Sequence, residues 1–339
     1  MSLAKSFARK VVFPVINRLG IEKLLSASSG NSYQILMYHG VVKTKNIQLS
    51  ANHCSLAEFE KEILYLKKNF DIVPLTEIFK RAREKIRPAR KTIAITFDDG
   101  YENNYTNAYK ILKSYNVPAT IFVVASCILN PDHLLWYDYL DILKQKINFS
   151  IFPTIDVALT EHKLKELREI SDLSAFRLFL KSINTSSKYK VLEKLFDKNI
   201  SDKIISGTDL EFRKMLSASQ MEEMTSSGLI EIGSHSLTHP NLDTLSNDEI
   251  MIELQESKKL LEGAIKKEVV SIAFPDGAYN ETVKELAIKA GYRNLLSVEY
   301  RLPSDIGDPH ILPRFCISNT TTPDSNFLQI HLGFKKWGF

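Results

Sequence analysis

"TIAITFDDGYENNY", residues 92–105, begins as a strand and ends in a polar turn. Residues 92–97 are rich in β-branched side chains and apolar on both faces, which predicts a buried parallel strand. Asp98 and Asp99 follow directly and precede Gly100. An Asp-Gly pair is common in tight turns, whereas two adjacent carboxylates repel each other. The stretch therefore indicates either a plain turn or a reactive carboxylate pair at the end of a strand.

The composition is that of a globular protein. The chain has 339 residues, 44% apolar and 25% charged, which is enough to bury a full core. A formal net charge of +4 is too mild for nucleic-acid binding, which requires a concentrated basic stripe. Cys54, Cys127 and Cys316 are widely spaced and form no C-x-x-C pair, so they indicate a reducing compartment and no disulfide framework.

The N-terminal segment, residues 1–32, mixes basic and apolar side chains. It lacks the uninterrupted apolar core of a secretory signal, and no stretch reaches the roughly 18 apolar residues that a membrane span needs. A basic amphipathic segment can lie on an anionic membrane surface, and a helix packed on the domain is the alternative. We expect a cytoplasmic protein, with residues 1–32 as a candidate peripheral contact to the inner face of the membrane.

From residue 33 onward, short apolar strands alternate with amphipathic helices. Ser55 and Glu58 form an S-x-x-E capping box that predicts the start of one of these helices. The alternation stops near residue 126, and residues of about 130–218 are mostly helical and polar, which predicts an insertion. This rhythm favours parallel β/α units in a doubly wound sheet or a barrel. The predicted strands are 33–40, 71–75, 92–97, 119–124, 229–234, 269–274 and 294–298, and the predicted helices are 56–70, 76–85, 103–115, 247–264 and 280–290.

Polar clusters follow four of these strands, at the rim where parallel β/α proteins build their sites. They are Tyr38-His39, Asp98-Asp99, the stretch 234–239 and the stretch 275–277. His235 and His239 are four residues apart, so a helical turn there would put both imidazoles on one face, where they can share a metal.

One carboxylate added to two histidines makes a site that leaves positions for water and substrate. The aspartate pair would then divide the work: one carboxylate binds the metal, and its neighbour accepts a proton from the water. Taken alone, H-x-x-x-H is more often structural and D-D-G more often a turn, but their joint occurrence after two strands favours a metal site. His39 remains either a strand-end histidine or a catalytic one, and Arg314 either a surface charge or part of the site.

These residues resemble the polysaccharide deacetylase family, carbohydrate esterase family 4, whose domain is a distorted (β/α)7 barrel. The T-F-D-D-G motif is intact at residues 96–100, and H-[ST]-x-x-H is intact at residues 235–239. The resemblance implies an α/β barrel of this type over residues 33–320, with the helical insertion of about 130–218, and a C-terminal tail over 321–339.

The resemblance also implies roles for individual residues. Asp99, His235 and His239 would bind a divalent metal, with Zn²⁺ as the first expectation, and Asp98 would be the general base. The third family motif, R-x-P-[YW]-G, reads here as residues 273–277, Ala-Phe-Pro-Asp-Gly, so its arginine and aromatic residue are absent. We expect the oxyanion and substrate to be bound by Pro275, Asp276 and Gly277.

Two further positions would complete the catalytic set. Arg314 is the candidate substitute for the missing arginine. The family's late leucine-x-histidine motif is not obvious near the C-terminus, and "LMYHGV", residues 36–41, is similar to the N-terminal Tyr-His of a permuted, surface-polysaccharide biosynthesis branch. His39 is therefore the candidate catalytic acid.

The function that the resemblance implies is metal-dependent hydrolysis of the N-acetyl group of an amino sugar, by attack of metal-activated water. The substrate would be an N-acetylated polysaccharide or its lipid-linked saccharide precursor. Trp136 and Tyr137 at the start of the insertion would stack on a sugar if they line the rim, whereas ordinary packing is the alternative. Hydrolysis of another carbon–nitrogen bond, in a formamido sugar or a cyclic ureide, and a catalytically impaired glycan-binding protein are the rival functions.

Overall fold

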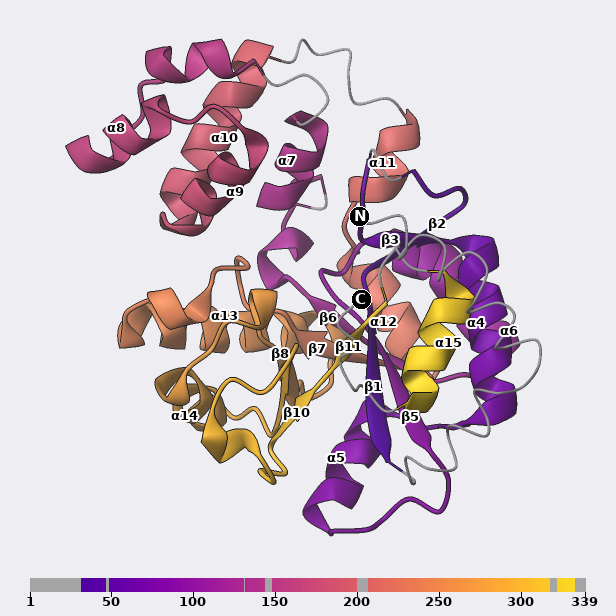
Figure 1. The fold of residues 1–339 in the computed structure, drawn as a ribbon. Coiled ribbons are helices and arrows are strands. Elements are labelled where there is room, and N and C mark those ends of the chain that lie inside the picture. The colour runs from indigo at the N-terminus through magenta and orange to yellow at the C-terminus, as the bar shows by residue number, and fades with distance from the viewer. Residues whose placement is uncertain are drawn as a thin grey trace.

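The computed structural model describes residues 32–46, 49–130, 132–143, 148–199, 207–317 and 322–332. Its main feature is a mostly parallel sheet that curls into a nearly closed barrel with helices around it (Figure 1). The strand order is β10-β9-β8-β7-β6-β5-β1-β11, and β4 also pairs with β5. These strands are β1 (Tyr33–Tyr38), β4 (Asp71–Ile72), β5 (Thr92–Phe97), β6 (Ala119–Val123), β7 (Ile230–Ser234), β8 (Ser271–Ala273), β9 (Asn294–Ser297), β10 (Ile311–Pro313) and β11 (Phe315–Cys316).

The last strand segment closes the barrel. β10 pairs with β9 at one edge of the sheet, and β11 pairs with β1 at the other edge. Only Arg314 separates β10 from β11, so residues 311–316 bridge the two edges. The predicted barrel is thus confirmed, and Arg314 lies at its seam.

Alternation along the strands separates two cores, as the pleat requires. All six residues of β5 are buried, as predicted for a strand covered on both faces. Ile93 and Ile95 pack into the layer under the surrounding helices. Ala94 packs instead with Phe122 and Leu296 inside the barrel. The inside of the barrel is thus filled by apolar side chains, and the polar residues that follow the strand ends form the rim.

The helices around the barrel agree closely with the predicted ones. Ser55 caps α4, and its reciprocal hydrogen bonds with Glu58 form the predicted capping box. The predicted strand at 71–75 is shorter, because Pro74 caps α5. Residues 104–108 form a π-helix before α6. The helices are α4 (Leu56–Asn69), α5 (Leu75–Arg83), α6 (Tyr109–Ser114), α12 (Ala218–Ser226), α13 (Asn247–Ile265) and α14 (Glu281–Lys289).

The predicted C-terminal tail contains a helix, α15 (Pro323–Leu332), that packs on α4. Its Phe327 ring stacks on Tyr65 with centroids 3.7 Å apart. Asn326 donates a 2.7 Å hydrogen bond to the buried carboxylate of Glu62. A short pair of strands that the sequence did not predict, β2 (Gly40–Val42) and β3 (His53–Ser55), extends beyond β1.

The insertion is a helical subdomain with its own apolar core, which includes Phe152, Phe176 and Leu192. In Figure 1 it stands above the carboxyl ends of the strands. The chain enters it after β6, through a short 3-10 helix (Ala125–Ile128), and returns at residues 214–216. There the Glu102 N–H donates to the Lys214 carbonyl at 2.7 Å and the Leu216 N–H donates to the Gly100 carbonyl at 2.9 Å. Its helices are α7 (Trp136–Leu143), α8 (Glu161–Arg168), α9 (Leu173–Lys181), α10 (Thr185–Asn199) and α11 (Gly207–Arg213).

The candidate membrane contact lies outside the described residues, which begin at residue 32. Among the helices of the described ranges, none has the length and apolar character needed to cross a membrane.

Candidate active site

The backbone after β5 explains how two adjacent aspartates serve different partners. The Asp98 N–H still follows the strand and donates to the Tyr38 carbonyl at 2.9 Å. Asp99 then takes a left-handed conformation, with φ 76°, and Gly100 follows with φ 84°. A Cβ on Gly100 would lie 3.2 Å from the Val123 Cα, so glycine is required there by space as well as by φ. Two successive left-handed residues turn the chain sharply, and the two carboxylates diverge.

Arg314 forms a bidentate ion pair with Asp98 through its guanidinium group. Nη1 donates to Oδ1 at 2.6 Å, and Nη2 donates to Oδ2 at 2.8 Å. Both side chains are almost fully buried, and Arg314 lies over the Phe122 ring, 5.4 Å from its centroid. Burial alone would raise the pKa of Asp98, but the Arg314 charge and hydrogen bonds outweigh it and lower the pKa to about 2. Asp98 is therefore anionic at neutral pH.

The two motif histidines lie on a loop, and the helical turn considered from their spacing is not present. Ser236 and His239 have φ 63° and 60°, which no right-handed turn allows. The loop is fixed to the neighbouring strand, because the His235 N–H donates to the Val123 carbonyl at 2.9 Å. The same loop is held from outside the barrel by Glu253 of α13. One carboxylate oxygen accepts from the backbone N–H groups of Leu237 and Thr238 at 2.8 and 2.9 Å.

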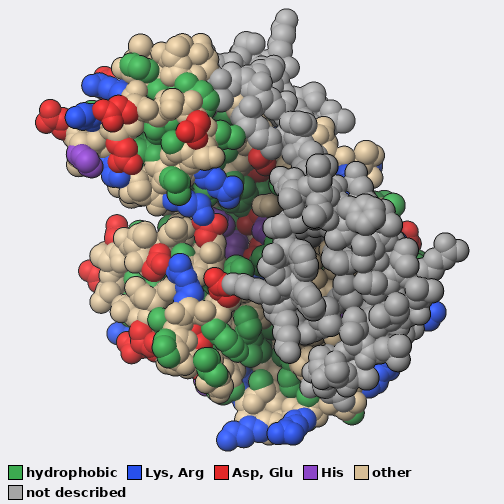
Figure 2. All heavy atoms as spheres, viewed as in Figure 1, with side chains coloured by type: hydrophobic (Ala, Val, Ile, Leu, Met, Phe, Trp, Pro, Cys, Tyr) green, Lys and Arg blue, Asp and Glu red, His purple; other side chains and the backbone are tan. Residues whose placement is uncertain are grey.

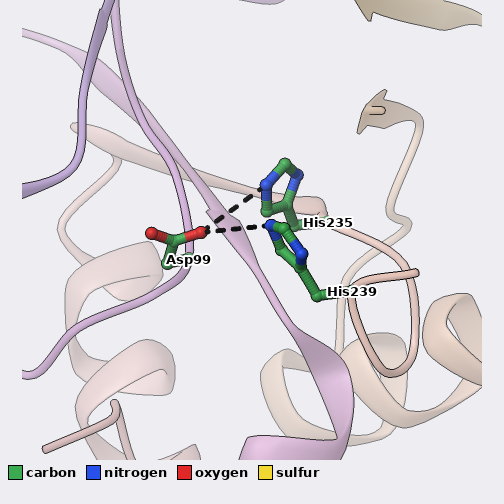
Figure 3. Close-up of side chains that lie close together, drawn as sticks. All are labelled: Asp99, His235 and His239. Atoms are coloured by element: carbon green, nitrogen blue, oxygen red, sulfur yellow. Dashed lines mark ion pairs between the residues drawn. The ribbon is translucent and has the colours of Figure 1, made fainter. Parts of the chain in front are cut away.

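Asp99, His235 and His239 converge at one point (Figure 3). Their potential ligand atoms lie within 4.8 Å of one another. Both histidine Nε2 atoms face the same Asp99 oxygen, at 3.6 Å from His235 and 3.7 Å from His239. His235 Nδ1 lies 2.8 Å from the Ala273 carbonyl, which can only accept, so Nδ1 carries the proton and Nε2 presents its lone pair.

The electrostatics of this triad fit a bound cation. Burial, followed by the charge of Asp98, raises the pKa of Asp99 well above its ordinary value. Burial lowers the pKa of both histidines, that of His239 to about 3, so both are neutral as metal ligands must be. Asp99 Oδ2 is buried without a hydrogen-bond partner among the described residues. Two imidazole nitrogens and one carboxylate oxygen form a donor set that is typical of catalytic zinc sites. A cation bound there would supply the positive partner that the buried Asp99 carboxylate lacks.

The loop after β8 carries the predicted oxyanion residues. Pro275 has no N–H, and the Gly277 N–H donates to the Phe274 carbonyl at 2.9 Å. The Asp276 N–H donates to no backbone or side-chain acceptor in the part of the chain that the structure describes. Of the three predicted residues, Asp276 is thus the one with a free backbone donor. It has a left-handed conformation with φ 53°, and its carboxylate lies 2.8 Å from Lys181 Nζ of α9.

His39 and Trp136 line the same cavity as the triad. Burial lowers the pKa of His39 to about 4, and its Nδ1 is buried without a hydrogen-bond partner among the described residues. Trp136 is only 2% exposed, and the Lys188 ammonium lies 4.8 Å from its ring centroid. Its face is therefore covered, and it forms part of the wall rather than an open platform for a sugar. The cavity gathers every predicted site residue except Pro275, and it is lined by Met37, His39, Asn52, Asp98, Asp99, Trp136, Tyr137, Arg177, His235, His239, Phe274, Asp276, Gly277, Val298 and Arg314.

Sequence reasoning missed several polar residues around the site, among them Glu253, Arg177 and Lys181. Glu253 lies in an ordinary amphipathic helix, and nothing in its spacing sets it apart from solvent-exposed glutamates. Arg177 and Lys181 lie in the insertion, whose orientation over the barrel no local pattern encodes.

The chain belongs to the polysaccharide deacetylase family. The family model, described as "Polysaccharide deacetylase", matches residues 85–167 and 183–295, which is more than half of the chain. This confirms the class of protein that the two motifs indicated, a family of hydrolases that act on carbon–nitrogen bonds.

Curated relatives agree with this assignment. The chain is 24% identical over 266 residues to the Bacillus subtilis (strain 168) protein named "Putative polysaccharide deacetylase YxkH", covering 78% of this chain and 64% of that relative's length. It is 22% identical over 308 residues to the poly-beta-1,6-N-acetyl-D-glucosamine N-deacetylase of Staphylococcus aureus (strain MRSA252), covering 85% and 80%.

The fold is similar to that of the Streptococcus pyogenes deacetylase PplD, solved in complex with acetate. The TM-score is 0.57 at 19% identity, over 88% of this chain and 97% of that one. IcaB from Ammonifex degensii gives a TM-score of 0.56 at 17% identity, over 90% and 98%.

Proposed function

We propose that this protein is a divalent-metal-dependent deacetylase that hydrolyses the N-acetyl group of an amino sugar in a polysaccharide or its lipid-linked precursor. The observation that carries the proposal is the convergence of Asp99, His235 and His239 beside the Asp98–Arg314 pair in a single cavity. The S. aureus relative, whose name gives an N-acetylglucosamine polymer as its substrate, supports the choice of bond.

Asp99 and the two Nε2 atoms of His235 and His239 would hold the metal, with Zn²⁺ as the first choice for this donor set. When bound, such an ion lowers the pKa of water toward neutrality and polarises a carbonyl oxygen. The chain fixes the donors before metal arrives: the Ala273 carbonyl sets the His235 tautomer, and Glu253 holds the loop between the two histidines.

Asp98 would take the proton from the attacking water. Its low pKa keeps it deprotonated in the resting site, and both of its oxygens are aligned by Arg314. A carboxylate this acidic holds a proton only briefly, so the proton must move on to a stronger base. His39 lies in the same cavity and is neutral at rest, because burial holds its pKa near 4. We assign His39 to receive that proton and to deliver it to the departing amine nitrogen.

The Asp276 N–H would donate to the carbonyl oxygen as it gains negative charge. A preformed donor of this kind commonly contributes about 3 kcal/mol to transition-state stabilisation. Asp276 lines the cavity in a left-handed conformation, and its side chain is paired with Lys181. Loss of the family's aromatic residue at this position is therefore compatible with the backbone role.

Acetate release tests the proposal. The chelator-stripped protein is reloaded with Zn²⁺ and incubated with a panel of oligosaccharides that contain N-acetylglucosamine, N-acetylgalactosamine or N-acetylmannosamine, and with one formamido sugar. We expect metal-dependent release of acetate, with one new free amine for each acetate. Formate release from the formamido sugar in preference to acetate would place the enzyme on another carbon–nitrogen bond, and no release of either acid by the reloaded protein would refute the proposal.

A further inference from the structure

The underside of the insertion brings cations to the mouth of the cavity. Arg177 of α9 lines the cavity wall itself. Lys181, one helical turn later, reaches across to Asp276 of the barrel at 2.8 Å. Lys188 of α10 lies behind Trp136, with its ammonium 4.8 Å from the ring centroid. Figure 2 shows Lys and Arg side chains gathered on the insertion's side of the groove, opposite the histidines at its base.

Two of the negative charges in this region already have partners. Asp98 is paired with Arg314, and Asp276 is paired with Lys181. The side chains of Arg177 and Lys188 make no hydrogen bond and no salt bridge within the described ranges. A divalent ion held by Asp99 would add one more net positive charge. The groove therefore carries a cationic surplus that its own side chains do not balance.

The burial of Lys188 strengthens this argument, because this cationic residue is only 4% exposed. Removing an ammonium group from water is costly, and contact with an indole face offsets only a part of that cost. The Lys188 charge acts on His239 and Asp276, so it contributes to the field inside the groove. A buried positive charge close behind the wall of a groove favours an anionic ligand in that groove.

Two of these three cations, Arg177 and Lys181, lie outside the part of the chain matched to the family, and Lys188 lies inside it. The family model skips residues 168–182, the stretch that contains both Arg177 and Lys181. The basic underside of the insertion therefore requires an explanation beyond the deacetylation chemistry.

We infer that the insertion binds an anionic substituent, a carboxylate or a phosphate, on the saccharide whose N-acetyl group lies at the triad. The inference rests on the proposed function and deepens it, since it names the substrate as an acidic glycan rather than a neutral homopolymer. Arg177 would contact the anion directly, in the fork geometry that suits both groups, while Lys188 raises the local positive potential.

Measuring the affinity for oligosaccharides tests this inference separately from the hydrolysis reaction. Titration calorimetry with the zinc-loaded Asp98→Asn variant would compare three tetrasaccharides that share one N-acetylglucosamine. One carries a glucuronate neighbour, the second has that carboxylate reduced to the alcohol, and the third carries a phosphomonoester in its place. The charged oligosaccharides are expected to bind at least about fivefold more tightly than the neutral one, as one charge-assisted contact provides, with a preference that shrinks at high salt. The tighter of the two charged ligands identifies the anion.

A matched pair of variants assigns the effect. Arg177→Gln, in the Asp98→Asn background, removes the exposed cation of the groove and is expected to bring the charged-to-neutral affinity ratio close to one. Lys190→Gln makes the same charge change on α10 but lies at a separate surface hollow with Asp156 and Glu193, so the ratio should persist. Equal affinities for charged and neutral ligands, or no binding of either, would overturn the inference, as would a ratio that Arg177→Gln leaves intact. The acetate assay with the intact enzyme judges the proposed function independently.

Discussion

Replacing Arg314 by methionine should reduce kcat/KM by roughly two orders of magnitude while leaving metal binding intact. Arg314 is the sole arginine in contact with Asp98 among the described residues, and its two hydrogen bonds of 2.6 and 2.8 Å join groups that are both buried. The shift of the Asp98 pKa from 3.8 to about 2 corresponds to about 2.4 kcal/mol of net stabilisation of the carboxylate anion, to which Arg314 is the largest contributor. The expected loss of rate comes from lost alignment of this carboxylate, since a misplacement of about 1 Å can cost roughly 100-fold.

The pH dependence of kcat/KM shows in which direction the Asp98 pKa moves when Arg314 is replaced. Without Arg314, the largest influence that opposes burial is lost, so the Asp98 pKa rises from its value of about 2. The acid limb of the kcat/KM profile should therefore move to higher pH in Arg314→Met, because Asp98 must be deprotonated to act. Arg314→Lys keeps a charge but loses the two-armed geometry, so its rate should lie between the parent and Arg314→Met.

The assay is acetate release between pH 4 and 9, with zinc content measured on the same samples. A double variant, Arg314→Met with Asp98→Asn, provides the control for folding: it leaves no unpaired buried charge, so it should be more stable than Arg314→Met yet remain inactive. The reasoning is refuted if Arg314→Met retains kcat/KM within threefold of the parent with an unmoved acid limb.

Three further predictions concern the metal, the helix packing and the turn. His239→Gln should weaken zinc binding by more than roughly 100-fold, which exceeds the effect of losing a residue that only supports a ligand. His162→Gln, at an exposed position, should leave zinc affinity unchanged. Equal zinc affinities of the two variants in a competitive chelator titration would contradict the ligand assignment. Glu62 has its pKa raised to about 7 by burial, so the free energy of unfolding should fall by about 3 kcal/mol as pH rises from 4.5 to 7, and Glu62→Gln should remove this fall in denaturant titrations across that range. Gly100→Ala should lower the free energy of unfolding by about 2 kcal/mol, since φ 84° and the close Val123 backbone exclude a Cβ; an unchanged midpoint in urea would show that the turn relaxes.

Local patterns in the sequence predicted parallel β/α units, as a doubly wound sheet or a barrel, and a candidate metal site; the family resemblance then selected the barrel and assigned the three ligands. The β-branched run of β5, the polar residues directly after it, and the four-residue spacing of the histidines are all visible within short windows. Their common rim position follows from parallel β/α topology alone.

The conformations that make the site work were not predictable in the same way. Asp99, Ser236, His239 and Asp276 all have positive φ, although none is a glycine. Tertiary hydrogen bonds help to fix these loops, such as those from the Leu237 and Thr238 N–H groups to Glu253, which lies more than a dozen residues away. Spacing alone suggested a helical turn at the histidines, and these tertiary contacts impose a loop instead.

The residues that contact the catalytic carboxylate also lie far from it in the sequence. Arg314 is 216 residues from Asp98 and reaches it because the last strand segment closes the barrel at its seam. Proposing Arg314 required noticing that the third family motif lacked its arginine. The Lys181–Asp276 contact depends on how the insertion sits over the barrel, for which the sequence offers no periodic signal.

The central claim is that Asp99 binds the metal while Asp98 handles the proton, and Asp98→Asn tests it most directly. The measurement is zinc stoichiometry and acetate release on the same zinc-loaded sample, beside the parent and Asp99→Asn. We predict that Asp98→Asn keeps one zinc per chain and loses acetate release by at least roughly 100-fold, the scale of general-base catalysis, whereas Asp99→Asn loses the zinc itself. Near-parental acetate release by zinc-loaded Asp98→Asn, or full zinc retention by Asp99→Asn, would contradict the division of roles between the two aspartates.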